Sequence, residues 1–391
     1  MADHLTRMQA VQSPIIPIVA DLIRQHPGTI SLGQGIAYYG PPPQALEQIQ
    51  AFLEDPTNHQ YKAVQGIPNL ITAIEKKLIT DNQIFIEPDR NCIVVTAGSN
   101  MAFTNAVLAI TQTGDEIILQ SPYYFNHEMA IVMADCQPVI VPTNANYQLQ
   151  IEVMAAAITP RTKAIVTISP NNPSGAIYPE ADLRAVNQLC QAHGIYHIHD
   201  QTYEYFTYDG IPSFSPASIL GSSDYTISLF SFSKAYGLAG WRVGYMVIPA
   251  ALFFSVLKIQ DTVLICPPII SQYAALGALQ AGANYCLEKC QMIQQVRQIA
   301  LESLSDLGEW CRIPAAAGAF YFLLQIDTPQ KTMTVVERLI REHGVAVIPG
   351  TTFGMDYGCY LRVAYGALQR ETAATGIGRL VKGLKAVVKG S

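Results

Sequence analysis

One lysine, set among hydroxyl-bearing and small residues, constrains this chain more than any other feature. Lys234 lies in the segment SFSKAYGLAGWRVGY, residues 231–245, with Ser231 just before it and Arg242 further along the same segment. A lysine amine in this setting can form a Schiff base with an aldehyde cofactor, while a hydroxyl and a guanidinium group can hold that cofactor's phosphate. The segment therefore predicts a covalent cofactor site.

Composition narrows the class of protein. With 391 residues the chain exceeds the usual size of one hydrophobic core, so we expect one large domain and a smaller one. Half of the residues are hydrophobic and 14% are charged, which favours a large buried core. The net charge of -6 and the pI of about 5.7 give no electrostatic footprint for nucleic acid.

The cysteines and the N-terminal residues indicate a cytoplasmic protein. None of the 8 cysteines belongs to a Cys-x-x-Cys pair, and the spacing of Cys286 and Cys290 suits neighbours on a helix face as well as metal ligands. We expect structural, reduced thiols. No basic segment followed by an apolar core predicts a signal peptide, and no apolar run approaches the roughly 18 residues of a membrane-spanning helix.

Short β-rich runs alternate with longer helical stretches from about residue 70 to 250. The runs are nearly continuous in apolar residues and cover residues 93–96, 116–119, 163–168, 195–199 and 225–230. Such strands between helices favour a mostly parallel sheet covered on both faces. Ligands of these sheets lie beyond the carboxyl ends of the strands, so a site is expected there.

The pattern changes after about residue 285. A long polar helix over about 284–305 leads to strands at 320–324, 345–348 and 360–363 and a final helix from about 370, which predicts a small α+β domain. The first 45 residues contain several prolines and are expected to lie extended against it. We therefore divide the chain into a large domain, residues 46–285, and a small domain made of residues 1–45 and 286–391.

Polar residues follow three of the apolar runs. Asp200 ends one run, where a carboxylate is costly to bury unless paired, although a helix N-cap explains it equally well. Asn172 lies in the segment SPNNPSG, which by itself indicates only a turn. Gly98, Ser99 and Asn100 stand between a predicted strand and helix, where backbone N–H groups bind anions, but many α/β proteins have such a turn.

Two further residues are candidates for ligand contacts. Tyr124, in the segment SPYY, is either a stacking platform or an ordinary core or surface aromatic. Arg362 interrupts an apolar strand, and a buried arginine needs a partner. That partner is either an internal acid or a carboxylate ligand, which a guanidinium group binds through two parallel hydrogen bonds.

These segments, in this order, resemble the class I/II aminotransferases, the pyridoxal-phosphate enzymes of fold type I. The resemblance runs from about residue 30 to 366. It implies a large domain with a mostly parallel seven-stranded sheet plus a small α+β domain. Segments at 122–126, 202–206, 208–210 and 258–261 are similar to the plant methionine/aromatic aminotransferases and their cyanobacterial relatives.

The resemblance implies roles around pyridoxal 5'-phosphate. Lys234 would carry the cofactor, and Asp200 would keep its pyridine nitrogen protonated. Tyr203 and Asn172 would reach its phenolic oxygen, and Tyr124 would stack on its ring. The phosphate would be held by Gly98, Ser99, Asn100, Ser231, Ser233 and Arg242, with the Ser233 side chain expected to alternate away from that of Ser231.

Substrate contacts and assembly follow from the same resemblance. Arg362, Asn172 and the backbone of Gly35 would bind the substrate carboxylate. Tyr61 would reach the phosphate of a neighbouring subunit, which implies a homodimer with shared sites. Relatives commonly carry an acidic residue and a proline just beyond the glycine, and this chain has Ala37 and Tyr38 there instead, so side-chain specificity stays open.

The implied activity is transfer of an amino group from an amino acid, with an aromatic one or methionine favoured, to a 2-oxo acid by a ping-pong mechanism. Tyr38 and Tyr39 mildly favour an aromatic or apolar donor. The alternatives are an aspartate aminotransferase, a cysteine-conjugate β-lyase on the same scaffold, and a ligand-sensing regulator. The first would need a second cation near the side-chain pocket, and the last usually appends a DNA-binding domain.

A metal site is a further possibility, because His197, His199 and Asp200 are all metal-ligand types. Strand alternation puts the two histidines on one face and Asp200 on the other. We therefore expect no metal.

Overall fold

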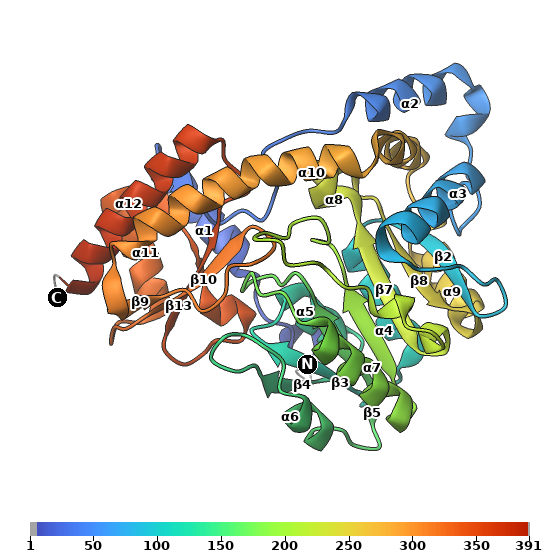
Figure 1. The fold of residues 1–391 in the computed structure, drawn as a ribbon, viewed down its shortest axis with the longest axis horizontal. Helices are drawn as coiled ribbons and strands as arrows, with labels where there is room; N and C mark the ends of the chain where they lie inside the picture. Colours follow the sequence, from blue (N-terminus) through green and yellow to red (C-terminus); the bar gives the residue numbers. More distant parts are fainter. Residues whose placement is uncertain (1–5, 390–391) are drawn as a thin grey trace, which may run out of the picture.

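The computed structural model describes residues 6–389, and its largest feature is a seven-stranded sheet (Figure 1). The strand order is β2-β8-β7-β6-β5-β3-β4, in which β8 runs antiparallel to both neighbours and the other pairs are parallel. The strands are β2 (Asn91–Thr96), β3 (Glu116–Ser121), β4 (Gln137–Pro142), β5 (Thr162–Ile168), β6 (Tyr196–Asp200), β7 (Thr226–Ser231) and β8 (Gly244–Pro249). The predicted fold-type I sheet is confirmed.

Helices cover both faces of this sheet. On one face pack α4 (Ser99–Ile110), α5 (Phe125–Met133) and α9 (Phe253–Leu264). On the other pack α3 (Pro68–Lys77), α6 (Ile151–Ala156), α7 (Glu180–His193) and the first half of α10 (Ile269–Ser305). Within β2, Val94 joins the core under α4, whereas Ile93 and Val95 join the core under α3. Burial on both faces explains the continuous apolar runs.

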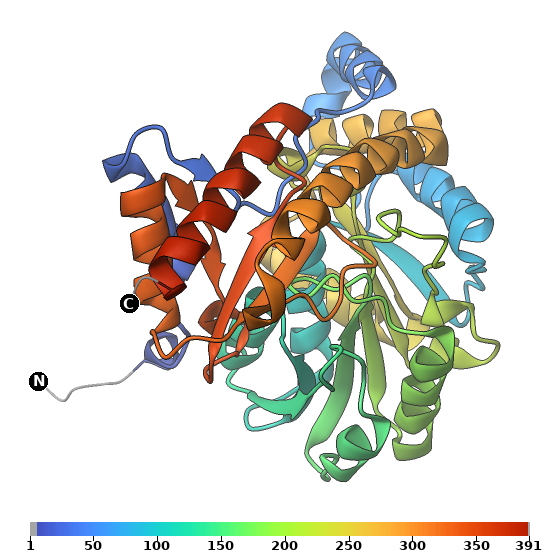
Figure 2. The ribbon, with the colours of Figure 1, turned by 60° about the vertical axis from the view of Figure 1, so that its left-hand side comes forward.

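The C-terminal part is built on a smaller antiparallel sheet with the strand order β12-β13-β10-β9. Its strands are β9 (Cys311–Arg312), β10 (Tyr321–Ile326), β12 (Ile348–Pro349) and β13 (Cys359–Ala364). It packs with α11 (Thr332–His343), α12 (Arg370–Lys389) and the second half of α10, and Figure 2 shows α12 beside α10. β1 (Ile30–Ser31) pairs in parallel with β11 (Val345–Ala346), so N-terminal residues lie against this part.

Two connecting helices shape the molecule. α10 is interrupted at Gly282, whose φ of 71° is left-handed, and α2 (Pro43–Glu54) packs on it.

The expectation of an extended N-terminal segment is wrong for α1 (Ile15–Gln25). Pro14 is its N-cap and Pro17 lies in its first turn, where a proline loses no helical hydrogen bond.

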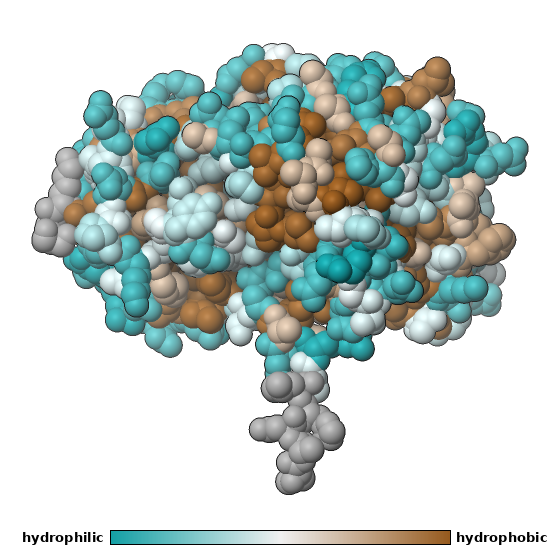
Figure 3. Space-filling view, turned by 90° about the horizontal axis from the view of Figure 1, so that it is seen from below, coloured by the Kyte–Doolittle hydropathy of each residue, from teal (hydrophilic) through white to brown (hydrophobic). Residues whose placement is uncertain are grey.

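The outer surface carries polar and apolar residues together. Figure 3 shows hydrophobic side chains gathered near the middle of one face, with hydrophilic ones around them. Across residues 6–389, no helix is both long and apolar enough to cross a lipid bilayer.

A chain of polar side chains lies buried between the sheet and α7. Thr167 Oγ1 contacts His197 Nε2 at 2.8 Å and His199 Nδ1 at 2.6 Å, so both histidines share one face, as strand alternation predicts. Asn187 Nδ2 lies 3.2 Å from His197 Nδ1. Burial lowers the pKa of His197 to about 3 and holds that of His199 well below its usual value. In residues 6–389 no three potential metal ligands come together.

These two histidines predict acid sensitivity. Because the folded protein keeps them neutral while the unfolded chain protonates them near pH 6.5, the free energy of unfolding falls as pH drops below about 6.5, by about 1.4 kcal/mol per pH unit for each histidine. Urea unfolding between pH 7 and pH 4.5 measures this slope. His197→Asn is expected to flatten it, and His193→Asn, at an exposed position, is the control. Equal slopes for wild type and His197→Asn would contradict the prediction.

Candidate active site

A cavity of about 190 Å³ lies at the carboxyl ends of the parallel strands. Every predicted site residue lines it except Gly98 and Tyr61. Ile16, Phe125, Ile168, Thr202 and Tyr321 complete the lining. Segments far apart in the sequence thus meet at one place, as the parallel sheet requires.

Lys234 stands on α8 (Phe232–Ala235), a short helix that begins where β7 ends. Ser231 caps it by accepting a hydrogen bond of 3.2 Å from the Ser233 backbone N–H. The strand has already ended here, so the expected alternation of the two serines is wrong and both line the cavity. The Lys234 ammonium donates to the Gly35 carbonyl.

The surroundings of Lys234 disfavour its charged form. Desolvation, and then the positive charges of Arg362 and Arg242, lower the pKa of Lys234 to about 8. A substantial fraction of the amine is therefore neutral near physiological pH, which suits a nucleophile or a base.

An anion cradle forms beside Lys234. Gly98 is the N-cap of α4 with a φ of 83°, and no side chain caps the first N–H groups of this helix. A Cβ at Gly98 would lie 2.5 Å from Arg242 Nη2, so a larger residue would force the guanidinium to shift. Ser99 accepts a hydrogen bond of 3.2 Å from Thr202. Helix N–H groups, hydroxyls and an arginine make a fitting phosphate site.

Asp200 lies at the end of β6 and is almost fully buried. Its Oδ1 accepts a hydrogen bond of 2.9 Å from the Thr202 N–H, and its Oδ2 lies 3.3 Å from His127 Nε2. The His127 ring stacks on Phe103 with centroids 3.9 Å apart. Sequence patterns did not single out His127, which lies on α5 and belongs to no motif considered above.

Tyr124 lies at the N-cap of α5 and reaches over the cavity. Its hydroxyl accepts a hydrogen bond of 2.8 Å from Asn126 and lies 3.4 Å from Asn100 Oδ1. The ring stands edge to face with His127 at 5.2 Å. Tyr124 therefore has an ordered ring on the cavity wall, as a stacking role requires.

Tyr203 and Tyr321 form a hydroxyl pair 2.6 Å apart. Burial holds the pKa of Tyr203 well above its usual value, so it stays protonated and can donate. Burial also raises the pKa of Tyr321 to about 12, against the effect of Arg362. Sequence analysis missed Tyr321, because alternation along an apolar strand indicates only a core residue.

Arg362, on β13, is 2% exposed and reaches across to the large sheet. Its Nη1 donates to Asn172 Oδ1 at 3.0 Å and its Nη2 to the Gly33 carbonyl at 2.8 Å. Tyr321 and Phe353 lie against the guanidinium plane at 4.7 and 4.8 Å. Within residues 6–389 it pairs with no carboxylate, and its buried Nε has no hydrogen-bond partner.

The N-terminal loop closes the cavity. A Cβ at Gly35 would lie 2.4 Å from the Tyr321 hydroxyl, so the close approach requires glycine. Tyr38 and Tyr39 do not line the cavity, and Tyr39 donates instead to the Lys234 carbonyl at 2.7 Å. The two tyrosines therefore give no support for an aromatic donor. Tyr61 is 77% exposed and lies outside the cavity of its own chain.

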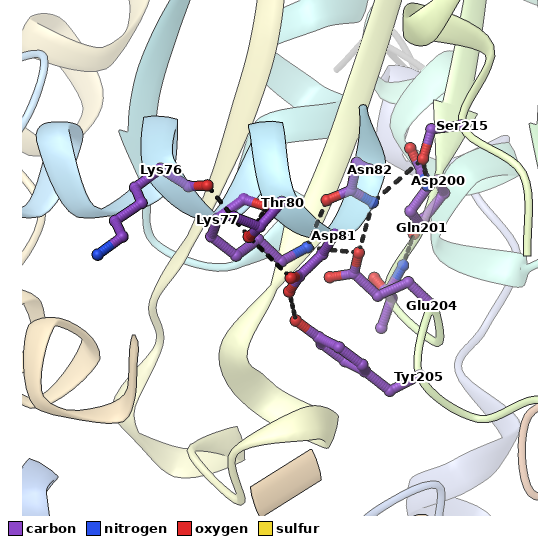
Figure 4. A network of polar contacts seen from close by, with 11 residues as sticks. Lys76, Lys77, Thr80, Asp81, Asn82, Asp200, Gln201, Glu204, Tyr205 and Ser215 are labelled. Carbon is purple, nitrogen blue, oxygen red and sulfur yellow. Dashed lines mark hydrogen bonds and ion pairs between the residues drawn. The ribbon is translucent and has the colours of Figure 1, made fainter. Parts of the chain in front are cut away.

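A polar network fixes the segment that carries Asp200 and Tyr203 (Figure 4). Lys77 and Glu204 form an ion pair of 2.5 Å whose side chains are only 7% and 11% exposed. Asn82 donates to Glu204 at 2.8 Å and to Ser215 at 3.1 Å, and Gln201 donates to Ser215 at 2.6 Å. The network ties residues 200–205 to α3 and the turn that follows it.

Comparison with known proteins identifies relatives along nearly the whole chain. The family model described as "Aminotransferase class I and II" matches residues 27–380. The aromatic aminotransferase ISS1 of Arabidopsis thaliana is 33% identical over 97% of this chain and 95% of its own. A probable aspartate/prephenate aminotransferase of Aquifex aeolicus is 32% identical over 96% of both chains. The solved structure of a Thermus thermophilus aspartate aminotransferase single mutant superposes with a TM-score of 0.89, at 30% identity over 98% of this chain and 100% of its own.

Breaking the buried ion pair is expected to destabilise the fold. Lys77→Met leaves the Glu204 carboxylate unpaired and buried, which costs about 3–5 kcal/mol of unfolding free energy. Urea unfolding at pH 7 measures the loss. The exposed neighbour Lys76 gives the matched control, Lys76→Met, which is expected to behave like wild type. A Lys77→Met protein as stable as this control would contradict the prediction.

Removing the charge of Arg242 is expected to raise the pKa of Lys234. Arg242→Gln takes away one of the two positive charges that lower this pKa to about 8, while desolvation and Arg362 remain. The pKa is therefore expected between about 8 and the usual value of about 10.4. The pH dependence of Lys234 labelling by an amine-reactive reagent, read by peptide mass spectrometry on cofactor-free protein, measures it. An unchanged or lower midpoint would contradict the electrostatic explanation.

Proposed function

We propose that this chain, which belongs to the class I and II aminotransferases, transfers the amino group of an aromatic or other large apolar amino acid to a 2-oxo acid. It is a transaminase whose cofactor is pyridoxal 5'-phosphate. The observation that carries the choice of donor is the cavity lining, which includes the apolar side chains of Ile16 and Phe125 and, as cations, Lys234, Arg242 and Arg362.

The residues of the cavity fit the cofactor. When bound, pyridoxal phosphate supplies an aldehyde that captures amines and a ring that accepts the electron pair released at the substrate Cα. We assign the phosphate to the uncapped start of α4, with Ser99, Asn100, Ser231, Ser233 and Arg242, because this set joins N–H donors, hydroxyls and a positive charge.

The chemical roles follow from charge and protonation. Asp200, buried and held by Thr202, is the carboxylate that keeps a ring nitrogen protonated. Tyr203 keeps its proton and would donate a hydrogen bond to the cofactor's phenolic oxygen, beside Asn172. Lys234 Nζ, with a pKa of about 8, would serve as the base that takes the proton from the substrate Cα. The donor and the acceptor use one cavity in turn, which predicts ping-pong kinetics.

Arg362 binds the carboxylate shared by every amino acid and 2-oxo acid. Its contacts to Asn172 and Gly33 fix the guanidinium plane and leave the buried Nε–H for a ligand. A carboxylate that accepts two parallel hydrogen bonds satisfies this geometry. The backbone of Gly35 lies beside the same place and contributes to carboxylate binding.

Side-chain recognition falls to Ile16, Phe125 and Tyr321. The cations that line the cavity are Lys234, Arg242 and Arg362, and each already has a role. A donor with a second carboxylate would therefore bury that charge without a partner from this chain. Relatives named as aspartate aminotransferases keep the aspartate-type activity as the second candidate.

Assembly and location extend the proposal. We infer a homodimer, because Tyr61 is 77% exposed and can serve a phosphate site only if a second copy presents that site to it. The division at residues 45 and 285 would separate the two sheets and let the smaller part move against the larger one. A cytoplasmic location agrees with eight free cysteines.

A donor panel tests the proposal. Phenylalanine, tyrosine, methionine and aspartate are each assayed against pyruvate, 2-oxoglutarate and phenylpyruvate. The best aromatic donor is expected to exceed aspartate in kcat/KM by roughly 100-fold, because only the apolar side chain matches the wall. Lys234→Ala, the control, is expected to abolish turnover with every donor. Equal kcat/KM values for aspartate and the aromatic donors would contradict the proposed specificity, and turnover by Lys234→Ala would contradict the proposed mechanism.

A further inference from the structure

We propose that a small cavity beside His127 holds one ordered water, which bridges Gln120 and His127 and fixes the His127 proton on the nitrogen that faces Asp200. Gln120 is then a positioning residue for the site. The water and the tautomer are inferred from the geometry around His127 alone, whereas their importance for catalysis rests on the function proposed above.

The cavity has the size and the lining of a water site. Its volume is about 10 Å³, which corresponds to about one water. Gln120 and His127 both line it, and both are almost completely buried, at 6% and 1% exposure. Within residues 6–389, Gln120 Nε2 and both ring nitrogens of His127 have no hydrogen-bond partner. Two orphaned polar groups at one cavity meet the condition for a bound water.

The other polar residues at this cavity are Tyr123, Tyr124 and Asn171, and within residues 6–389 none of them has a buried atom without a partner. Asn171 donates to the Ile168 carbonyl and to Tyr178, and its Oδ1 accepts from Ser174. The amide of Asn171 is therefore occupied on both its nitrogen and its oxygen. Gln120 and His127 remain as the partners for a water.

The surroundings of His127 decide which nitrogen carries the proton. Nε2 lies 3.3 Å from Oδ2 of the Asp200 carboxylate, whose oxygens accept hydrogen bonds. Phe103 stacks on the ring, the Tyr124 ring stands edge to face with it, and Nε2 faces Asp200, so Nδ1 is the nitrogen left for the cavity. A neutral imidazole that donates from Nε2 must accept at Nδ1. A water is the smallest group that can donate there.

Gln120 completes the arrangement from β3. Its amide holds the water from the opposite side, and in either orientation of the amide a water hydrogen remains for His127 Nδ1. The opposite tautomer would place an Nε2 lone pair against the Asp200 carboxylate. The chain Gln120, water, His127 therefore holds Asp200 Oδ2, while Thr202 holds Oδ1 at 2.9 Å. Both carboxylate oxygens are then fixed.

Two measurements on the pyridoxal-phosphate holoenzyme test the proposal. Histidine-selective ¹⁵N NMR reports the protonated nitrogen of His127, and a high-resolution crystal structure reports the water. Wild type is expected to show protonated Nε2, unprotonated Nδ1, and one water within hydrogen-bond distance of Gln120 and Nδ1. In Gln120→Met, of similar length, the water is expected to be lost and the Nδ1 resonance to shift. Gln325→Met, on a strand of the smaller sheet, is the matched control and leaves both unchanged.

The outcomes separate this inference from the proposed function. Protonated Nδ1 in wild type, an empty cavity, or a His127 spectrum unaltered in Gln120→Met would overturn the water bridge, whatever the donor panel gives. Should Gln120→Met fail to fold, the protonated nitrogen of His127 and the presence of the water in wild type still test the proposal. A confirmed bridge in an enzyme that rejects aromatic donors would leave the inference standing and overturn only the specificity.

Discussion

The site depends on an imbalance of charge in one cavity. Three cations, Lys234, Arg242 and Arg362, line it with a single carboxylate, and that carboxylate is already engaged by His127 and Thr202. The hydrogen-bond partners of Arg362 are neutral groups, and they do not compensate its buried positive charge. The cavity of the folded chain therefore carries an excess of positive charge until anions bind. A phosphate at one end and a carboxylate at the other supply them, so binding and stability are linked.

This imbalance also explains why Lys234 can react. Its amine lies near two fixed guanidinium charges and is partly desolvated, and both effects favour the neutral form. The same groups that attract the anions therefore prepare the nucleophile. One electrostatic arrangement serves binding and chemistry, which is why the three cations have to converge although they come from different segments.

Contacts across the cavity join the two sheets. Arg362 bonds to Asn172, Tyr321 pairs with Tyr203, and Lys234 donates to Gly35. Each contact links a residue of the large sheet to one of the small sheet or the N-terminal loop. The site is thus completed where the parts meet. A ligand at Arg362 or near Tyr203 would therefore contact residues of both parts at once.

Local sequence patterns predicted the site residues that lie at or just after strand ends. They did not predict the residues whose place in the site depends on contacts with distant segments. Asp200 ends a predicted strand and Asn172 and Lys234 follow two others, so their meeting at one edge of the sheet could be predicted, whereas the roles of Asp200 and Asn172 were expected from the family resemblance. The orientation of Ser233 was predicted wrongly because β7 ends at Ser231, which alternation alone cannot locate.

Tyr321 and His127 could not be found for a different reason. Each lies on an ordinary amphipathic or apolar element, and its partner is far away in sequence, so no local pattern marks it. The N-terminal residues show the same limit. Their prolines indicated an extended segment, yet they form α1, and its Ile16 reaches the cavity.

That helix bears on how the enzyme chooses its donor. The groups that act on the amino, Cα and carboxylate atoms come from the interior sheet and β13, where burial fixes them. In the function proposed above, the wall that would meet the variable side chain includes Ile16 from α1 and Phe125 at the start of α5. Both lie at element ends and are only partly buried, so they can change without disturbing the cations or Asp200. Chemistry and specificity are therefore carried by different layers of the fold, and donor preference can diverge among relatives that share one reaction.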